Sequence, residues 1–164
     1  MIGFKLTTAT VEALNQRISD EYAAHYFYRC AANWCEETNY KKAAEFFSKE
    51  ADNELEHAKG IQEYLTGFGE IPTMEAINVK KDYHFDTLFE IILSSYEMEL
   101  DLMKKYNNLS SILLHSDLTT FDFLTPYRIE QGEAIVEYAD LLDAMELIDK
   151  EDKFQVLYFE QTYM

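Results

Sequence analysis

One glutamate and one histidine in the sequence have the spacing of metal ligands. Glu54 and His57 lie three residues apart in a long stretch of helical periodicity, and side chains at positions i and i+3 of an α-helix share one face. Polar side chains also interrupt the centres of three other such stretches: Glu21, Glu99, and Glu130 with Gln131. The midpoints of equal helices in a bundle share one level, so we expect these residues to converge in the core.

Carboxylates gathered in an apolar interior need a counter-charge. Each buried carboxylate loses its hydration, and several at one level repel each other. The apolar stripes carry no lysine or arginine near their midpoints, so a bound cation is the group that would neutralise these acids. Glutamate and histidine without a thiolate favour iron or manganese over structural zinc. In this interpretation Glu54 bridges two metal ions and His57 binds one of them.

Four long helices are predicted to carry these residues. We expect them at about 8–37, 40–66, 82–115 and 118–148, followed by a short fifth helix at about 151–163. Only 5 glycines and 2 prolines interrupt the chain, which favours a few long helices over many strands. Thr8 is the expected N-cap of the first helix, and Thr119 or Thr120 that of the fourth. Pro126 falls early in the fourth helix and conflicts mildly with a regular helix.

The lengths of the connections predict the topology. The breaks near residues 38 and 117 are short, so each joins two antiparallel helices. The segment 67–81 is long enough to extend roughly 50 Å, whereas a helix of this size is roughly 42 Å long. It can therefore cross the whole bundle and make the second and third helices parallel. The sequence thus predicts an all-α four-helix bundle, folded as a single domain over residues 1–164.

The charge of the chain excludes some partners. Its 14 basic and 31 acidic residues give a net charge of −17, which repels nucleic-acid phosphates. The plain explanation is a self-repelling soluble surface, and the sharper one is that some carboxylates gather cations. The chain has no apolar run long enough for a membrane span, and its start lacks the pattern of a signal peptide. We expect a cytoplasmic protein that binds neither nucleic acid nor membrane.

The two cysteines, Cys30 and Cys35, are interpreted as buried apolar side chains. Five residues along a helix place them roughly 140° apart, which argues against a mutual disulfide. Their spacing fits neither a Cys-x-x-Cys redox pair nor a zinc pattern. The sequence therefore predicts no cysteine chemistry.

Several segments resemble a non-haem ferritin, and the resemblance covers nearly the whole chain. Glu54 and His57 lie in ADNELEHA at 51–58 and match the Glu-x-x-His of ferritin-like di-iron proteins. The run EYLTGFGEIP at 63–72 resembles the ferritin exit into a long crossover. TFDFL at 120–124, followed by Glu130 and Gln131, resembles the opening of the fourth ferritin helix. Tyr28 lies seven residues after Glu21, where ferritins place a tyrosine beside the metal site.

The resemblance implies a ferritin-like bundle that oxidises and stores iron. By this match Glu21, Glu54 and His57 hold one iron. Glu54 and Glu99 hold the second, with Gln131 nearby, and Tyr28 is a one-electron donor or a hydrogen-bond partner. In such proteins Fe(II) is oxidised by oxygen or hydrogen peroxide and stored as ferric mineral in a hollow shell of 24 identical subunits. The apolar fifth helix would then line an axis between subunits.

Other positions depart from related patterns. Leu55 stands where bacterioferritins carry a haem-binding methionine, so no haem is expected. Asn53 and Ala134 replace acidic residues of other members, the second of them a ligand of a third iron site. Glu130 followed by Glu133 resembles a bacterioferritin Glu-x-x-His with glutamate in place of histidine. Either Glu130 or Gln131 can thus face the metals, and the apolar stripe favours Gln131.

Three alternatives to a ferritin are open at this point. A twelve-subunit mini-ferritin would share the bundle, but it predicts a basic DNA-binding tail that this sequence lacks. A rubrerythrin-like di-iron peroxidase in oxidative-stress defence usually adds a four-cysteine module, and only two cysteines are present. The third alternative is a metal-free helical interaction module, which metal analysis of the purified protein would distinguish directly.

Overall fold

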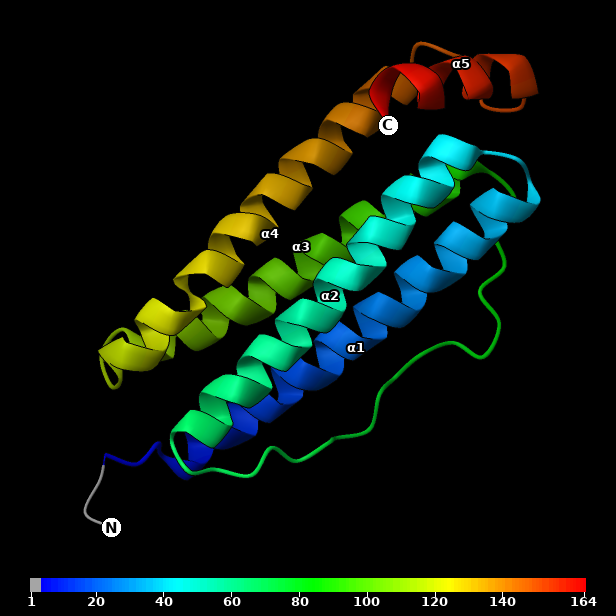
Figure 1. The fold of residues 1–164 in the computed structure, drawn as a ribbon. Helices are drawn as coiled ribbons and strands as arrows, with labels where there is room; N and C mark the ends of the chain where they lie inside the picture. Colours follow the sequence, from blue (N-terminus) through cyan, green and yellow to red (C-terminus); the bar gives the residue numbers. More distant parts are fainter. Residues whose placement is uncertain (1–3) are drawn as a thin grey trace. The chain divides into compact units, whose positions relative to one another are not determined.

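The computed structural model describes residues 4–164 and contains five helices (Figure 1). They are α1 (Thr8–Glu37), α2 (Lys41–Gly67), α3 (Leu88–Leu113), α4 (Leu118–Met145) and α5 (Lys153–Tyr163). Over this described range the structure has no strand, which agrees with the predicted all-α class. No helix in the same range is long and apolar enough to cross a membrane.

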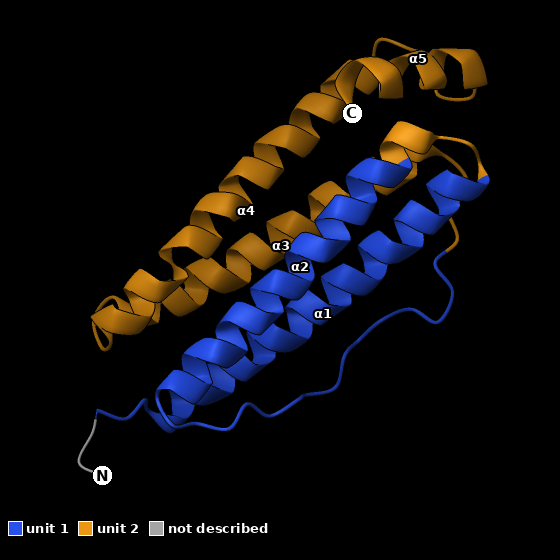
Figure 2. Cartoon of the chain, in the orientation of Figure 1, with its two compact units in different colours: residues 1–37, 44–83 blue, residues 38–43, 84–164 orange. Residues whose placement is uncertain are grey.

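The chain divides into two compact units (Figure 2). The first unit consists of the described residues up to 37 together with 44–83, and the second consists of 38–43 and 84–164. Helix α2 therefore begins in the second unit and continues in the first. The expectation of a single domain over the whole chain stays a prediction.

In the first unit, α1 and α2 form an antiparallel helical hairpin. Buried apolar side chains of these two helices include Leu14, Ile18, Tyr28, Phe47, Ile61 and Leu65. Thr7 caps α1, because its Oγ1 accepts a hydrogen bond of 3.1 Å from the Thr10 amide. The prediction of Thr8 as the cap was wrong by one residue.

The long connection after α2 lies along this hairpin from one end to the other (Figure 1). Gly69 opens it with a φ of +78°, a left-handed conformation that glycine adopts without steric cost. Further along, the Thr73 amide donates to Asn15 Oδ1 at 3.1 Å, and the Tyr83 ring packs edge-on against Phe27 with centroids 5.2 Å apart. These contacts attach the segment to α1 at two distant points, as expected for a crossover of this length.

In the second unit, α3 and α4 are antiparallel and joined by a short turn (Figure 1). Helix α3 begins at Leu88 rather than near residue 82, because Thr87 is its N-cap and accepts from the Glu90 amide at 3.2 Å. The Glu90 carboxylate in turn accepts from the Asp86 amide at 2.8 Å. The predicted start was therefore six residues early, and the predicted end at His115 two residues late.

Asp117, and neither Thr119 nor Thr120, caps α4. Its Oδ1 accepts from the Thr120 amide at 3.0 Å, which satisfies one of the free amides of the first turn. The helix contains Pro126 and ends at Met145, three residues before the predicted end. Near Pro126 the Arg128 guanidinium donates to Ser110 Oγ on α3 at 2.6 Å and lies over the Phe121 ring at 4.3 Å. Arg128 therefore connects the two helices at this level.

Helix α5 packs through Val156 and Phe159, which are buried. It begins at Lys153, two residues later than predicted, after the N-cap Asp152. Its Glu160 is 1% exposed, and Oε2 accepts a hydrogen bond of 2.9 Å from the Ala43 amide in the first turn of α2. Lys153 Nζ donates to the Thr38 carbonyl at 3.0 Å. The C-terminal helix thus contacts the turn before α2 and the first turn of α2.

The two cysteines differ in burial. Cys35 is fully buried, as predicted, whereas Cys30 is only partly buried. The interpretation of both as core side chains was therefore wrong for Cys30. It lies on α1 one turn after the exposed Tyr26, where the helix surface meets the crossover near Tyr83.

Candidate metal centre

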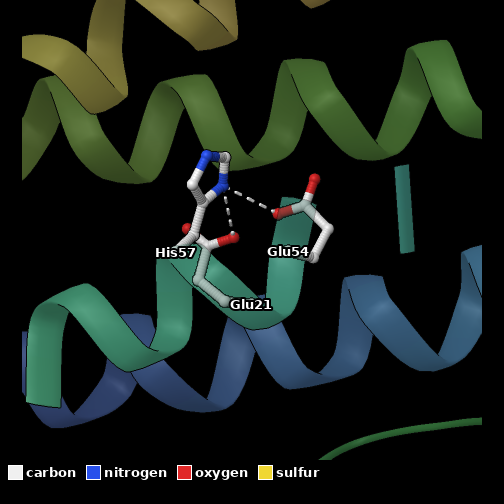
Figure 3. A group of neighbouring side chains, drawn as sticks. All are labelled: Glu21, Glu54 and His57. Carbon is white, nitrogen blue, oxygen red and sulfur yellow. Dashed lines mark hydrogen bonds and ion pairs between the residues drawn. The ribbon is translucent and has the colours of Figure 1, made fainter. Parts of the chain in front are cut away.

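Three of the predicted ligands meet inside the first unit (Figure 3). Glu21 comes from α1, and Glu54 and His57 come from two successive turns of α2. One donor atom of each lies within 4.8 Å of the others, and the described residues contain no other group of three or more such side chains this close. Glu21 and Glu54 are 1% and 3% exposed, so two carboxylates are held almost entirely away from water.

The histidine faces both carboxylates through a single nitrogen. His57 Nδ1 lies 3.1 Å from Glu54 Oε2 and 3.6 Å from Glu21 Oε2. Burial of the ring lowers the pKa of His57, but hydrogen bonding and charge attraction from Glu21 and Glu54 outweigh it and raise this pKa to about 11. At neutral pH the metal-free cluster therefore holds an imidazolium between two carboxylates, and one negative charge is left over.

Hydrogen bonds between α1 and α2 fix the helices on both sides of this cluster. One turn after Glu21, His25 Nδ1 donates to the Ala51 carbonyl at 2.7 Å. On the other side, Gln62 Nε2 donates to the Tyr22 hydroxyl at 3.0 Å. These contacts hold the two backbones in register, so Glu21 and Glu54 are kept close although they repel each other.

The predicted residues of the third and fourth helices meet in the second unit. Glu99 on α3 is 1% exposed, and Gln131 on α4 is 4% exposed. Gln131 Nε2 donates to Glu99 Oε2 at 2.5 Å and approaches the Glu99 carbonyl at 3.4 Å. Glu130, the alternative to Gln131, is exposed. Of the two candidates, Gln131 is the one on the buried face, while a metal-binding role for Glu99 and Gln131 stays a prediction.

Tyr28 is fully buried on α1, almost two turns after Glu21. Its ring stacks on Phe47 of α2 with centroids 6.1 Å apart, and Phe27 contacts it edge-on at 5.4 Å. The packing holds the phenol in a fixed orientation. Its role beside the metals stays a prediction.

The donor set suits a hard or borderline cation. Two carboxylates and one imidazole nitrogen, with no thiolate, are ligands typical of iron, manganese or zinc sites. A divalent cation would compensate both buried carboxylates and would displace the proton from His57 Nδ1, because a metal and a proton compete for the same lone pair. The arrangement therefore fits a metal ion exchanged for a proton.

The ferritin family model, described as a ferritin-like domain, matches residues 11–148. The chain belongs to the ferritin family. The match begins within α1 and ends just beyond α4, so it covers the segments that carry all the predicted ligands.

Several curated bacterial ferritins align with this chain over most of their length. A bacterial non-heme ferritin of Campylobacter jejuni is 29% identical over 144 residues, which are 87% of this chain and 86% of the relative. One of Escherichia coli is 27% identical over 91% of this chain and 89% of its own length. One of Staphylococcus epidermidis is 27% identical over 93% and 92%.

Solved ferritin structures have the same fold. An open-pore ferritin from the hyperthermophilic archaeon Archaeoglobus fulgidus matches with a TM-score of 0.89 at 24% identity, over 97% of this chain and 98% of that one. Chlorobium tepidum ferritin matches with a TM-score of 0.83 at 22% identity, over 96% of each chain. These matches confirm the predicted all-α ferritin fold, a four-helix bundle with a long crossover and a short fifth helix.

One buried carboxylate was missed by sequence reasoning. Glu160 lies in the C-terminal helix, where the apolar pattern drew attention to Phe154, Leu157 and Phe159. The signal was available, because position 160 follows 156 by four residues and so shares the face of the apolar Val156. Its partner, the Ala43 amide, is a backbone group 117 residues away and leaves no mark in the sequence.

Proposed function

We propose that this protein stores iron and oxidises Fe(II) to Fe(III) as it takes the metal up. The observation that carries the proposal is the cluster of Glu21, Glu54 and His57, in which two carboxyl groups almost fully shielded from water face one histidine nitrogen. The family and the non-heme ferritins among its relatives support iron as the cation.

The proposed first iron is bound by Glu21, Glu54 and His57. On binding, His57 releases the proton from Nδ1, and this nitrogen becomes the ligand because it already points at both carboxylates. The proposed second iron takes Glu54 as a bridging ligand and Glu99 as its own, with Gln131 donating a hydrogen bond to Glu99. The ligands of the second iron are proposed from the resemblance to ferritins.

A pair of irons suits the chemistry of the proposed oxidants. Each Fe(II) gives one electron, so two irons together reduce oxygen to hydrogen peroxide, or hydrogen peroxide to two waters, with uptake of two protons. Holding both irons on shared carboxylates makes the two electrons available together and limits the release of radicals. We propose Tyr28 as a further one-electron donor, since it is a buried phenol on α1, the helix that also carries Glu21.

The proposed assembly is a homo-oligomeric shell, 24 subunits by the ferritin pattern, that encloses the ferric mineral. The exposed apolar side chains of α5, Phe154 and Tyr158, support contact between copies. The cytoplasm is its predicted location. Nucleic acid, membrane and haem are not predicted partners.

Iron loading of the metal-free protein tests the proposal. Fe(II) added in air should give ferric absorbance, and the Glu54→Ala, His57→Ala double variant should slow its formation by about 100-fold or more, because loss of even outer groups at metal sites costs 10- to 100-fold. Glu56→Ala is the matched control, since this carboxylate lies on the same helix but is exposed. Metal analysis of the purified protein should find iron in the parent and much less in the double variant. An unchanged rate in a folded double variant would refute the assignment.

A further inference from the structure

A second group of reactive side chains lies in the first unit, apart from the metal ligands. Tyr26 and Cys30 are one turn apart on α1, and the Tyr26 hydroxyl donates a hydrogen bond to the Cys30 thiol. Tyr83, at the end of the crossover, faces Tyr26 with ring centroids 6.0 Å apart. Lys80 Nζ lies 5.8 Å from the Tyr83 ring. We name this group the Tyr26–Cys30–Tyr83 cluster.

A series of aromatic contacts connects the cluster to the buried Tyr28. The Tyr83 ring meets Phe27 edge-on at 5.2 Å, and Phe27 meets Tyr28 edge-on at 5.4 Å. Tyr28 is fully buried, whereas Tyr26 at the other end is 37% exposed. The rings therefore form a continuous path from the interior of the hairpin to its surface.

Tyrosine and cysteine side chains can each give up one electron. Tyr28 is at the buried end of this path, and Tyr26 with Cys30 is at the exposed end. Burial raises the pKa of the Cys30 thiol, and the neighbouring Cys30 raises the pKa of the Tyr26 hydroxyl. Burial also raises the pKa of Tyr83. All three groups keep their protons at neutral pH, so each loses an electron together with its proton. The hydrogen bond from Tyr26 to Cys30 provides a route for that proton.

We propose that the Tyr26–Cys30–Tyr83 cluster is the outer end of an electron-transfer path that reduces Tyr28 after Tyr28 has been oxidised at the iron site. This inference rests on the proposed function. Its use arises when hydrogen peroxide meets a subunit that holds a single Fe(II), because reduction of the peroxide needs two electrons and the iron supplies one. Tyr28 gives the second electron and becomes a phenoxyl radical, which is confined in the interior unless another group reduces it.

The electrons and atoms balance with Cys30 as the final internal donor. One Fe(II), one hydrogen peroxide, one proton and the Cys30 thiol yield one Fe(III), two waters and the Cys30 thiyl radical. Tyr83 and Tyr26 carry the electron between Tyr28 and Cys30 and are restored. A small-molecule thiol then gives a hydrogen atom to the Cys30 thiyl radical. This transfer restores the Cys30 thiol and leaves the radical on the small molecule, outside the protein.

The test uses the assembled protein loaded with one Fe(II) per subunit and mixed with one equivalent of hydrogen peroxide. Freeze-quench electron paramagnetic resonance follows the tyrosyl radical, and ferric absorbance follows iron oxidation. Cys30→Ser and Tyr83→Phe preserve size and packing but remove the electron donor, so each should lengthen the lifetime of the radical by about tenfold. Cys35→Ser is the matched control, because this thiol is fully buried on another face of α1, and it should leave the lifetime unchanged.

A second readout identifies the site of oxidation. The reaction is repeated with a spin trap that captures thiyl radicals. Mass spectrometry of the parent should then find the adduct on Cys30 and not on Cys35. Tyr83→Phe should reduce the yield of this adduct. If ferric product forms but the tyrosyl radical has the same lifetime in the parent and both variants, the path is overturned and the proposed function is left intact. Ferric product without any tyrosyl signal would have the same meaning. Absence of ferric product in the parent would remove the oxidant and overturn both.

Discussion

His57 shows how one side chain serves two states of the site. Without metal it is an imidazolium that links Glu21 and Glu54 across two helices, and in the proposed iron-bound state it would be a neutral ligand. The carboxylates of the proposed iron site thus create the proton affinity of His57 in the metal-free protein. In this proposal, metal uptake would be coupled to proton release.

We predict that the metal-free protein loses stability as pH rises through the alkaline range. The pKa of His57 is raised from 6.5 to about 11 by folding, so its contribution is complete below pH 6.5 and is lost as pH approaches 11. Between these values the folded state keeps a proton that the unfolded state has released, and the free energy of unfolding falls with a limiting slope of about 1.4 kcal/mol per pH unit.

Urea unfolding in the presence of a chelator measures this effect. The difference in unfolding free energy between the parent and His57→Gln should shrink steadily over this interval. His115→Gln is the control, since that ring is exposed just beyond the end of α3. A constant difference for His57→Gln would mean that no such proton is held.

Sequence reasoning predicted well which polar side chains are buried, for a physical reason. Glu21, Glu54 and Glu99 are acids in otherwise apolar helical stripes, and periodicity alone is enough to predict their burial. It also favoured Gln131 over Glu130, because adjacent residues point about 100° apart around a helix. It failed for Cys30, whose exposure depends on where the crossover runs, and a connection without periodicity gives no such information.

At the level of elements, the sequence predicted which helices exist better than where they begin. Helix α3 starts at Leu88 because Thr87 accepts a hydrogen bond from the Glu90 amide in the first turn. The Glu90 side chain accepts from the Asp86 amide just before the cap, and this Thr-x-x-Glu spacing is a readable capping signal. For α4 the choice of a threonine overlooked Asp117, which is an equally good cap two or three residues earlier. Local hydrogen bonding decides the residue at which a helix begins, whereas the apolar pattern gives that residue only to within a few positions.

We predict that Glu160 on α5 stabilises α2 from a distance. Its carboxylate accepts a hydrogen bond from the Ala43 amide at the positive, N-terminal end of the α2 dipole. Glu160 is buried, so water does not compete for this bond. Glu160→Ala should lower the free energy of unfolding by about 1–3 kcal/mol, as expected when a charged cap is lost. Glu160→Gln, which keeps an oxygen acceptor, should cost less.

Chemical denaturation of these variants supplies the measurement, with the exposed Glu151→Ala as the matched control on the same segment. Hydrogen exchange adds a local test, because the amide of Ala43 should lose protection in Glu160→Ala while amides in the middle of α2 keep theirs. Equal stability of Glu160→Ala and Glu151→Ala would show that the buried hydrogen bond contributes nothing.

At the scale of the whole molecule, the proposed shell would require copies of an acidic chain to associate despite its net charge of −17. Apolar contact is the available force, and α5 offers Phe154 and Tyr158, which are 78% and 65% exposed. We predict that Phe154→Glu with Tyr158→Glu leaves the helical content unchanged but breaks the assembly, because new charges would be buried at contacts between copies.

Light scattering distinguishes the outcomes. The parent should give about 460 kDa, the mass of 24 copies of the 19.3 kDa chain, and the double variant a much smaller particle. Asn107→Glu with Asn108→Glu adds the same charge at exposed positions of α3 and should keep the parent mass. A parent of half that mass would favour a twelve-subunit shell, and an intact double variant would exclude α5 from the contacts.

The bond between Glu160 and the start of α2 also has a consequence for biosynthesis. A ribosome makes Ala43 long before Glu160, and 117 positions separate the two. During that interval the first turn of α2 lacks this acceptor, although Glu54 and His57 have already been made. Glu160 therefore completes the first turn of a helix whose own residues are translated much earlier, so two distant parts of the chain depend on each other in time.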